Sequence, residues 1–209
     1  MRFNDLPTHW RRIFELEWLS LVNGSKAIAA VITDEHGNIV SEGRNMICEF
    51  EVPNPATLHA ETEAVRNLDT RRYDKHACTL YAGLEPCVMC MGTIVMGGIR
   101  KVEIAARDDF GGAMGLMDKS AFIRRKNMSV TWRDDVLGDI QRGLQALREL
   151  LYNTDADKLA RMLDDFAVHN KAGVEAAKAL IESGAFAEKK PSDYSAEQAV
   201  DMLLELIEA

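Results

Sequence analysis

The residues whose types and spacing favour chemistry lie in two short segments, HAE at 59–61 and PCVMC at 86–90. One imidazole and two thiolates suit a catalytic zinc site, in which three protein ligands leave a fourth position for water. Cys87 and Cys90 are three residues apart, so on the first turn of a helix their side chains face the same way. His59 completes the set if a second helix lies beside the first. These segments predict one Zn²⁺ per subunit, bound by His59, Cys87 and Cys90.

Glu61 distinguishes a catalytic zinc site from a structural one. Zinc lowers the pKa of bound water from about 15.7 to roughly 7, and a neighbouring carboxylate takes that proton and returns it to a leaving group. A structural site normally closes with a fourth Cys or His, but Cys48 and Cys78 fall in other strand-like segments. We therefore expect Glu61 to be catalytic.

The elements that position these residues alternate between helix and strand up to residue 134. The pattern predicts a helix after Pro7, a hairpin of strands 27–33 and 39–42, a helix at 59–68 and a strand at 77–84. A helix opens near Pro86 and ends at Gly97-Gly98, and strands follow at 102–106 and 129–133. This alternation predicts a layered α/β domain in which helices cover a mixed sheet.

Everything after residue 134 follows a helical pattern. Apolar stripes recur at helical spacing, and Ser195 with Gln198 predicts a capping box for the last helix. We expect residues 153–209 to form a helical C-terminal extension. Its segment from residue 152 onward holds 12 acidic against 6 basic residues, and the sequence does not indicate its purpose.

The bulk composition favours an ordinary folded protein. The 209 residues are 47% hydrophobic and 28% charged, which excludes wholesale disorder. We see no bilayer-spanning apolar run and no secretory pattern at the start, so we expect a cytoplasmic protein without membrane contact. In a reducing compartment the close Cys87 and Cys90 pair favours a metal or redox site over a disulfide. The net charge of −8 has the wrong sign for a surface that attracts phosphate everywhere.

The full pattern, in which HAE is followed 28 residues after its histidine by the first cysteine of PCxxC, is the signature of zinc deaminases. The sequence resembles the cytidine and deoxycytidylate deaminase superfamily, nearest to its bacterial tRNA adenosine deaminase and guanine deaminase branch. The resemblance runs over 27–130 and includes SEGRN at 41–45, LEPCVMC at 84–90 and ARD at 106–108. It implies a three-layer α/β/α fold with a five-stranded mixed sheet, a deaminase domain over residues 1–152 and a homodimer.

The resemblance also assigns residues to the substrate. Asn45 would hydrogen-bond the base, and the backbone around Ala60 and Glu85 would hold the base against the metal. Asp108 corresponds to a residue that contacts a neighbouring nucleotide in the tRNA enzymes. Two departures weigh against tRNA: DFG at 109–111 replaces a segment that usually carries lysine and threonine, and an acidic tail replaces a basic final helix.

Three functions are consistent with these features. The leading hypothesis is a hydrolytic deaminase of a nucleobase or nucleoside, with a purine favoured, in which hydroxide held by zinc attacks the amino-bearing carbon and ammonia leaves. The alternative is a tRNA wobble adenosine deaminase that converts adenosine to inosine. A non-catalytic zinc-stabilised scaffold is the third hypothesis, and it leaves Glu61 without a role.

Overall fold

A five-stranded sheet in the order β2-β1-β3-β4-β5 forms the centre of the protein. The structure is a computed structural model that describes residues 1–49 and 53–209. The strands are β1 Ala29–Thr33, β2 Ile39–Arg44, β3 Thr79–Leu84, β4 Lys101–Ala106 and β5 Ser129–Trp132. The sequence therefore predicted every strand of this sheet within a few residues.

The sheet is mixed because its connections are of two kinds. β1 pairs antiparallel with both β2 and β3. The tight turn between β1 and β2 contains Gly37, whose φ of 83° suits glycine. β3, β4 and β5 run parallel, which requires longer crossovers, and α3 (Val88–Gly97) supplies the first one. The sheet thus presents both faces to helices.

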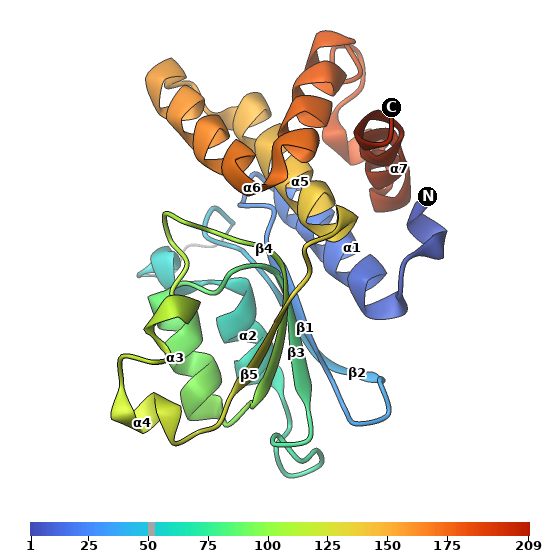
Figure 1. Cartoon of the computed structure of the whole chain (residues 1–209). Helices are drawn as coiled ribbons and strands as arrows, with labels where there is room; N and C mark the ends of the chain where they lie inside the picture. Colours follow the sequence, from blue (N-terminus) through green and yellow to red (C-terminus); the bar gives the residue numbers. More distant parts are fainter. Residues whose placement is uncertain (50–52) are drawn as a thin grey trace.

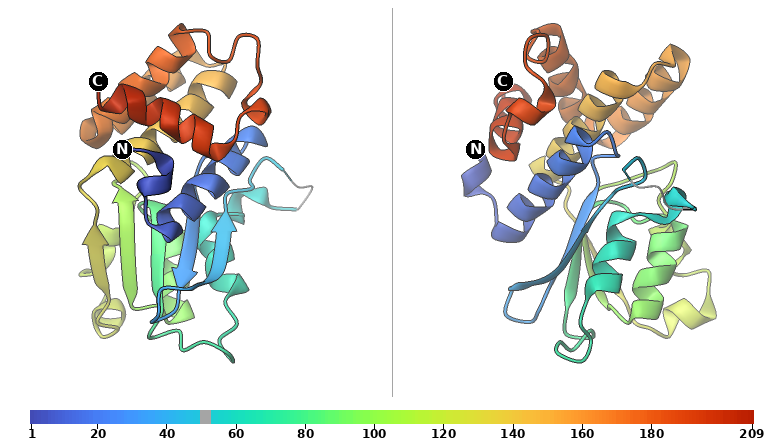
Figure 2. Two further views of the ribbon diagram at one scale, coloured as in Figure 1. Left: turned by 90° about the vertical axis from the view of Figure 1, so that its right-hand side faces the viewer. Right: turned by 180° about the vertical axis from the view of Figure 1, so that it is seen from behind.

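Helices cover both faces of the sheet, as Figures 1 and 2 show. α2 (Ala60–Asn67) and α3 lie on one face, and α1 (Thr8–Val22) and α5 (Val136–Tyr152) lie on the other. β1 is buried throughout because its side chains alternate between the two layers. Ala30 and Ile32 pack in the cluster that includes Ala64 and Ile94, whereas Ala29 and Val31 pack in the cluster of Trp10 and Leu144. The predicted three-layer α/β/α architecture is confirmed.

The C-terminal helices pack above this core. α6 (Ala156–Glu182) lies against α5, and α7 (Ala196–Ile207) contacts α6 and α1 (Figure 1). Their apolar stripes join the same cluster that α1 and α5 form. The Ser195 capping box is confirmed, since Gln198 N–H donates to Ser195 Oγ at 3.1 Å and Ser195 N–H to Gln198 Oε1 at 2.9 Å. The remaining short elements are α4 (Ala121–Arg124) and the 3₁₀ turns Phe3–Asp5, Pro55–Thr57, Met114–Leu116 and Pro191–Asp193.

α6 is bent near its middle, where Asn170 leaves the helical region with φ −130° and ψ 54°. The side chain of Asp139, on α5, contacts the backbone and side chain at the bend. Its Oδ1 accepts hydrogen bonds from Asn170 Nδ2 at 3.3 Å and from the Gly173 N–H at 3.4 Å. Gly173 also permits close approach, because a Cβ there would lie 2.0 Å from the Asp139 carbonyl oxygen. The bend divides α6 into two helical arms.

One carboxyl group is buried between α1 and the sheet. Glu17 is fully buried, and neither carboxylate oxygen has a hydrogen-bond partner in the part of the chain that the structure describes. Its Oε1 lies 1.9 Å from where a Cβ on Gly83 would be. Burial raises the pKa of Glu17 well above its usual range.

Across residues 1–49 and 53–209, no helix combines the length and apolar character that crossing a membrane requires.

Candidate functional site

Two helix starts bring the predicted metal ligands together. His59 is the N-cap of α2 and Cys87 is the N-cap of α3, while Cys90 lies on the first turn of α3. The helix at Cys87 begins slightly later than the sequence suggested, with Pro86 before the cap. α2 and α3 pack side by side (Figure 1), and this brings the side chains of His59 and Cys87 within 3.5 Å of each other.

The geometry of the three side chains fits zinc. His59 Nδ1 lies 3.5 Å from Cys87 Sγ and 3.5 Å from Cys90 Sγ. Zn–S bonds of about 2.3 Å and Zn–N bonds of about 2.0 Å at tetrahedral angles separate nitrogen from sulfur by about 3.5 Å. The donor atoms of the three residues all lie within 4.8 Å of one another. His59, Cys87 and Cys90 could therefore hold a metal ion, and their spacing fits tetrahedral zinc.

The pKa values of the two thiols are also consistent with a metal site. Hydrogen bonding with Cys90, and then with His59, lowers the pKa of the Cys87 thiol to about 3. The neighbouring Cys87 thiolate, together with burial, raises the pKa of Cys90. A cation bound between the two sulfurs would favour thiolates at both positions. Thr62 Oγ1 lies 3.6 Å from Cys90 Sγ and supports that sulfur from behind, a contact that sequence reasoning missed.

Six of the polar residues that meet at one pocket come from four segments of the chain. The pocket has a volume of about 330 Å³, and these residues are Asn45, His59, Glu61, Glu85, Cys87 and Asp108. Most of the residues predicted to bind metal or substrate thus line one cavity. Of the two others, Cys90 is buried beneath the pocket as a metal ligand, and Ala60 is absent from the lining among the described residues.

Glu61 lies in the first turn of α2, two residues after the metal-binding histidine. Its side chain is 3% exposed and still reaches the pocket that His59 and Cys87 line. Burial is the largest cause that raises the pKa of this carboxyl. A carboxyl group in this position can exchange protons with a molecule that occupies the pocket.

Asn45 follows β2 and is held by its backbone. Its N–H donates to the Ile28 carbonyl at 2.9 Å, and its own carbonyl accepts from Ser20 Oγ at 2.9 Å. The side-chain oxygen accepts from the Ile47 N–H at 3.3 Å, whereas the amide nitrogen has no hydrogen-bond partner among the described residues. The rigid backbone therefore presents a free amide donor at the pocket.

Ala60 is the first residue of α2, and it is fully buried. Its N–H belongs to the first turn of the helix, where N–H groups lack partners within the helix. Its carbonyl oxygen lies 2.2 Å from where a Cβ on Gly43 would be, so β2 and α2 touch through backbone atoms. This contact fixes α2, and with it His59, against the sheet.

Glu85 has a structural role in the pocket that the sequence did not indicate. Its carboxylate accepts the N–H groups of Asp108 and Met114, each at 3.1 Å, and so clamps both ends of the glycine-rich segment 108–114. Gly112 makes room for this clamp, since a Cβ there would lie 2.3 Å from the Glu85 carboxyl carbon. Asp108 stabilises the same segment, because its Oδ1 accepts the N–H of Phe110 at 3.3 Å and of Gly111 at 3.2 Å.

The helical layer holds this segment from the other side. Arg142 of α5 is 3% exposed, and its Nη2 donates to the Arg107 carbonyl at 2.6 Å and lies 3.5 Å from Asp108 Oδ1. On α6, His169 Nε2 lies 2.9 Å from Asp109 Oδ2. These contacts join residues at least 34 positions apart, so no local sequence signal could have identified them.

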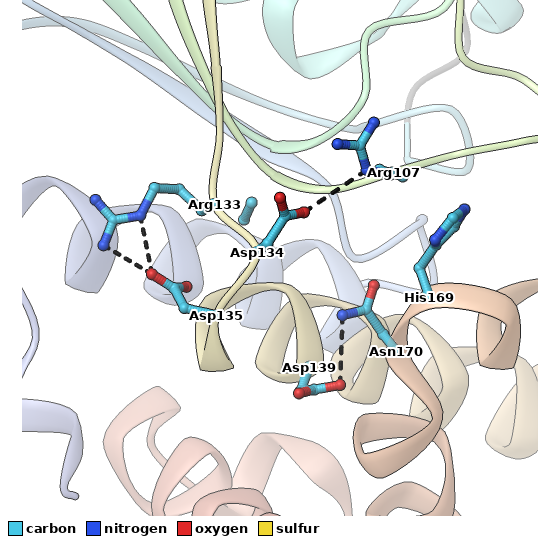
Figure 3. A pocket seen from close by; sticks show the side chains of 8 residues that line it. Arg107, Arg133, Asp134, Asp135, Asp139, His169 and Asn170 are labelled. Carbon is cyan, nitrogen blue, oxygen red and sulfur yellow. Dashed lines mark hydrogen bonds and ion pairs between the residues drawn. The ribbon is translucent and has the colours of Figure 1, made fainter.

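A smaller pocket of about 220 Å³ lies where α5 and α6 meet the ends of β4 and β5. Figure 3 shows Arg107 facing Asp134, Arg133 facing Asp135, and Asn170 facing Asp139. Each cationic side chain of this pocket has an acidic partner, and none of the predicted site residues lines it. We do not regard it as the functional site.

Comparison with known proteins agrees with the site. Residues 9–106 match the family model of the cytidine and deoxycytidylate deaminase zinc-binding region. A probable cytosine deaminase of Schizosaccharomyces pombe is 38% identical over 79 residues, which cover 38% of this chain and 46% of the yeast protein. The tRNA-specific adenosine deaminase of Haemophilus influenzae is 37% identical over 94 residues, which cover 44% of this chain and 53% of that protein.

The fold also agrees with a solved structure. A guanine deaminase from Nitrosomonas europaea superposes with a TM-score of 0.52 at 24% sequence identity, covering 69% of this chain and 86% of that one. The chain spans about half the length of the two curated relatives above. The matched segment, residues 9–106, contains His59, Glu61, Cys87 and Cys90, so the candidate site lies within the part of the chain that is similar to the cytidine and deoxycytidylate deaminase zinc-binding region.

Proposed function

We propose that this protein is a zinc-dependent hydrolytic deaminase that acts on a nucleobase or nucleoside, with a purine as the favoured base. The observation that carries the proposal is the position of Glu61, which is buried and lines the same pocket as the ligands His59 and Cys87. A structural metal site has no use for a carboxyl group placed there. The related proteins named as adenosine and guanine deaminases support a purine, and the one named as a probable cytosine deaminase supports the shared chemistry.

Bound zinc would supply a Lewis acid that lowers the pKa of a water molecule at the open ligand position. Glu61 would accept a proton at the pocket and deliver it to the exocyclic amine of the base, whose amino-bearing carbon gains the oxygen of water and loses ammonia. The free amide donor of Asn45 orients the base through an acceptor on its edge. Ile28 and Leu84 form apolar walls that exclude bulk water.

The test measures ammonia released by the zinc-loaded protein from guanine, adenine, adenosine, cytosine, cytidine and an anticodon stem-loop RNA. Turnover should fall about 10²- to 10⁴-fold in Glu61→Gln, because the isosteric amide cannot shuttle protons. Glu63→Gln is the matched control, since Glu63 lies on the same helix and pairs with Arg66 at 2.7 Å. Undiminished turnover in Glu61→Gln with zinc bound would refute the assigned role.

A tRNA wobble adenosine deaminase is the second candidate, favoured by the similarity to the Haemophilus influenzae enzyme. It requires salt-sensitive binding of an anticodon stem-loop. Ammonia release from the RNA alone would establish this candidate over the first. Absence of RNA binding at low salt would eliminate it.

We also propose that the chain is a cytoplasmic homodimer, with residues 1–152 as the deaminase domain and 153–209 as a helical extension. An exposed apolar face of α3 supports the dimer. Val88 is 64% and Met96 72% exposed, and both border a shallow groove that Val65 and Met89 also line. A second copy that covers this face would place the metal helices of both subunits near the interface.

A further inference from the structure

A second and larger cavity adjoins the pocket of Glu61 and the metal ligands. It has a volume of about 550 Å³. Five residues line both spaces, namely Lys26, Ile28, Leu84, Asp108 and Phe110. We call the pocket at the metal ligands the inner chamber and this cavity the outer chamber. Because they share walls, a molecule seated in the inner chamber can extend into the outer one.

The far wall of the outer chamber comes from the first arm of α6. Lys158, Arg161, Met162, Asp165 and Phe166 line it, and their spacing of three and four residues places them on one face of the helix. Phe166 is buried beneath Arg142, whose guanidinium carbon lies 4.5 Å from the ring centre. Met162 and Phe166 supply an apolar floor, and the basic side chains stand at the rim.

The α6 wall of the outer chamber carries two basic side chains against one acid, Asp165, so its net charge is positive. Neither Lys158 nor Arg161 forms an ion pair within residues 1–49 and 53–209, although Lys178 on the same helix pairs with Glu175 at 3.0 Å. The acid Asp165 also lines the chamber, and Asp108 is matched by the buried Arg142. Two unpaired cations on one face are notable in a chain whose net charge is −8. They complement an anionic group.

An aromatic ring stands where the chambers meet. Phe110 is 90% exposed, lines both spaces and follows Asp108 on the clamped segment. An exposed ring on a held backbone offers a flat apolar face to a sugar or base. The junction therefore suits a group that is larger than a free base.

We propose that the outer chamber is a subsite for the phosphorylated ribose of the substrate, with the base in the inner chamber and the phosphate between Lys158 and Arg161. This inference rests on the proposed deaminase function and extends it to a substrate class, a phosphorylated nucleoside. A free nucleotide and an RNA chain share this chemistry, and the experiment separates them.

The test measures binding by calorimetry in zinc-loaded Glu61→Gln, so that no ligand is consumed. The probes are guanosine, adenosine, their 5′-monophosphates and an anticodon stem-loop RNA. At least one monophosphate or the RNA should bind about tenfold or more tightly than the matching nucleoside, because charge-assisted contacts are strong. Lys158→Ala combined with Arg161→Ala should remove that advantage and leave nucleoside binding unchanged. Lys178→Ala is the matched control on α6.

The outcomes test the subsite, distinguish a free nucleotide from an RNA chain, and separate the subsite proposal from the deaminase proposal. Monophosphate binding that depends on Lys158 and Arg161 assigns a free nucleotide, whereas RNA binding alone with the same dependence assigns an RNA chain. Equal binding of nucleoside and phosphorylated ligands, or an advantage that survives the double substitution, overturns the subsite. Ammonia release is measured separately. Phosphate-dependent binding without any turnover by the wild type refutes the deaminase proposal, whereas turnover of the monophosphates or the RNA that is unchanged by the double substitution refutes only the subsite.

Discussion

Replacing Gly43 by alanine should weaken zinc binding, although Gly43 contacts no metal ligand. A Cβ on Gly43 would lie 2.2 Å from the Ala60 carbonyl oxygen and 2.5 Å from the Ala64 nitrogen, both backbone atoms of α2. Ordinary contacts of a Cβ begin near 3.4 Å. Backbone atoms cannot rotate away as a side chain would, so α2 must move from β2 by about 1 Å.

The size of that movement sets the expected loss. His59 caps α2 and moves with it, whereas metal–ligand distances tolerate only about 0.2 Å. We expect the zinc affinity to fall about 10- to 100-fold, as it does when the groups that orient ligands are lost. Overpacking should also lower the free energy of unfolding by about 1–3 kcal/mol.

A competition titration with a chromogenic chelator measures the affinity, and urea unfolding measures the stability. Gly92→Ala is the matched control, because Gly92 lies in α3 and an added Cβ meets nothing within 4 Å among residues 1–49 and 53–209. It should keep the zinc affinity and stabilise the protein by about 0.5–1 kcal/mol. Zinc affinity in Gly43→Ala within about twofold of the wild type would refute the claim that β2 fixes the position of α2.

The remaining predictions concern the metal, a buried acid and the dimer. Cys87→Ala should release zinc and lower the melting temperature, as metal analysis and calorimetry would record; full zinc occupancy would show that the ligand set is wrong. Burial raises the pKa of Glu17, so between pH 4.5, its ordinary pKa, and its higher pKa in the folded state, the folded protein binds a proton that the unfolded chain does not. The free energy of unfolding should therefore decline as pH rises through this window, by at most about 1.4 kcal/mol per pH unit. Glu17→Gln should flatten this decline in urea titrations at successive pH values, and an unchanged slope would mean that another group causes it. Met96→Lys should convert a dimer to monomers in light scattering, because it places a charge on the exposed apolar face of α3; a wild type that is already monomeric contradicts the dimer proposal.

The metal centre was predictable because its ligands are set by local spacing. Cys87 and Cys90 lie within one helical turn, and His59 needed only that α2 pack beside α3. The strands were likewise encoded by short runs, and the capping box of Ser195 by its own four residues. These features depend on neighbours in the sequence, and their physical signal is therefore visible there.

Features that depend on distant partners were not predictable. Nothing in the sequence near Arg142 indicates that its guanidinium is buried against the Arg107 carbonyl. The clamp of Glu85 on the 108–114 segment requires the register of β3 and β4, which fixes where that segment starts. The acidic composition of the tail gave no indication that Lys158 and Arg161 of α6 line the outer chamber together. The composition of a segment averages over all faces of its helices, whereas a binding site is formed by the side chains of one face.

The angle of the bend in α6 determines where the first arm of the helix lies. From Asn170 to Lys158 the first arm is about 18 Å long at 1.5 Å per residue, so a change of about 10° in the bend would swing its tip by about 3 Å. That displacement is close to the width of a methylene group or a water molecule. The hydrogen bonds that Asp139 accepts from Asn170 and Gly173 lie at this bend, so changing them would be expected to change the width of the outer chamber, although none of the three residues is among the described residues that line it. Substitutions at this bend offer a way to change the size of ligand that the outer chamber accepts without altering the metal centre.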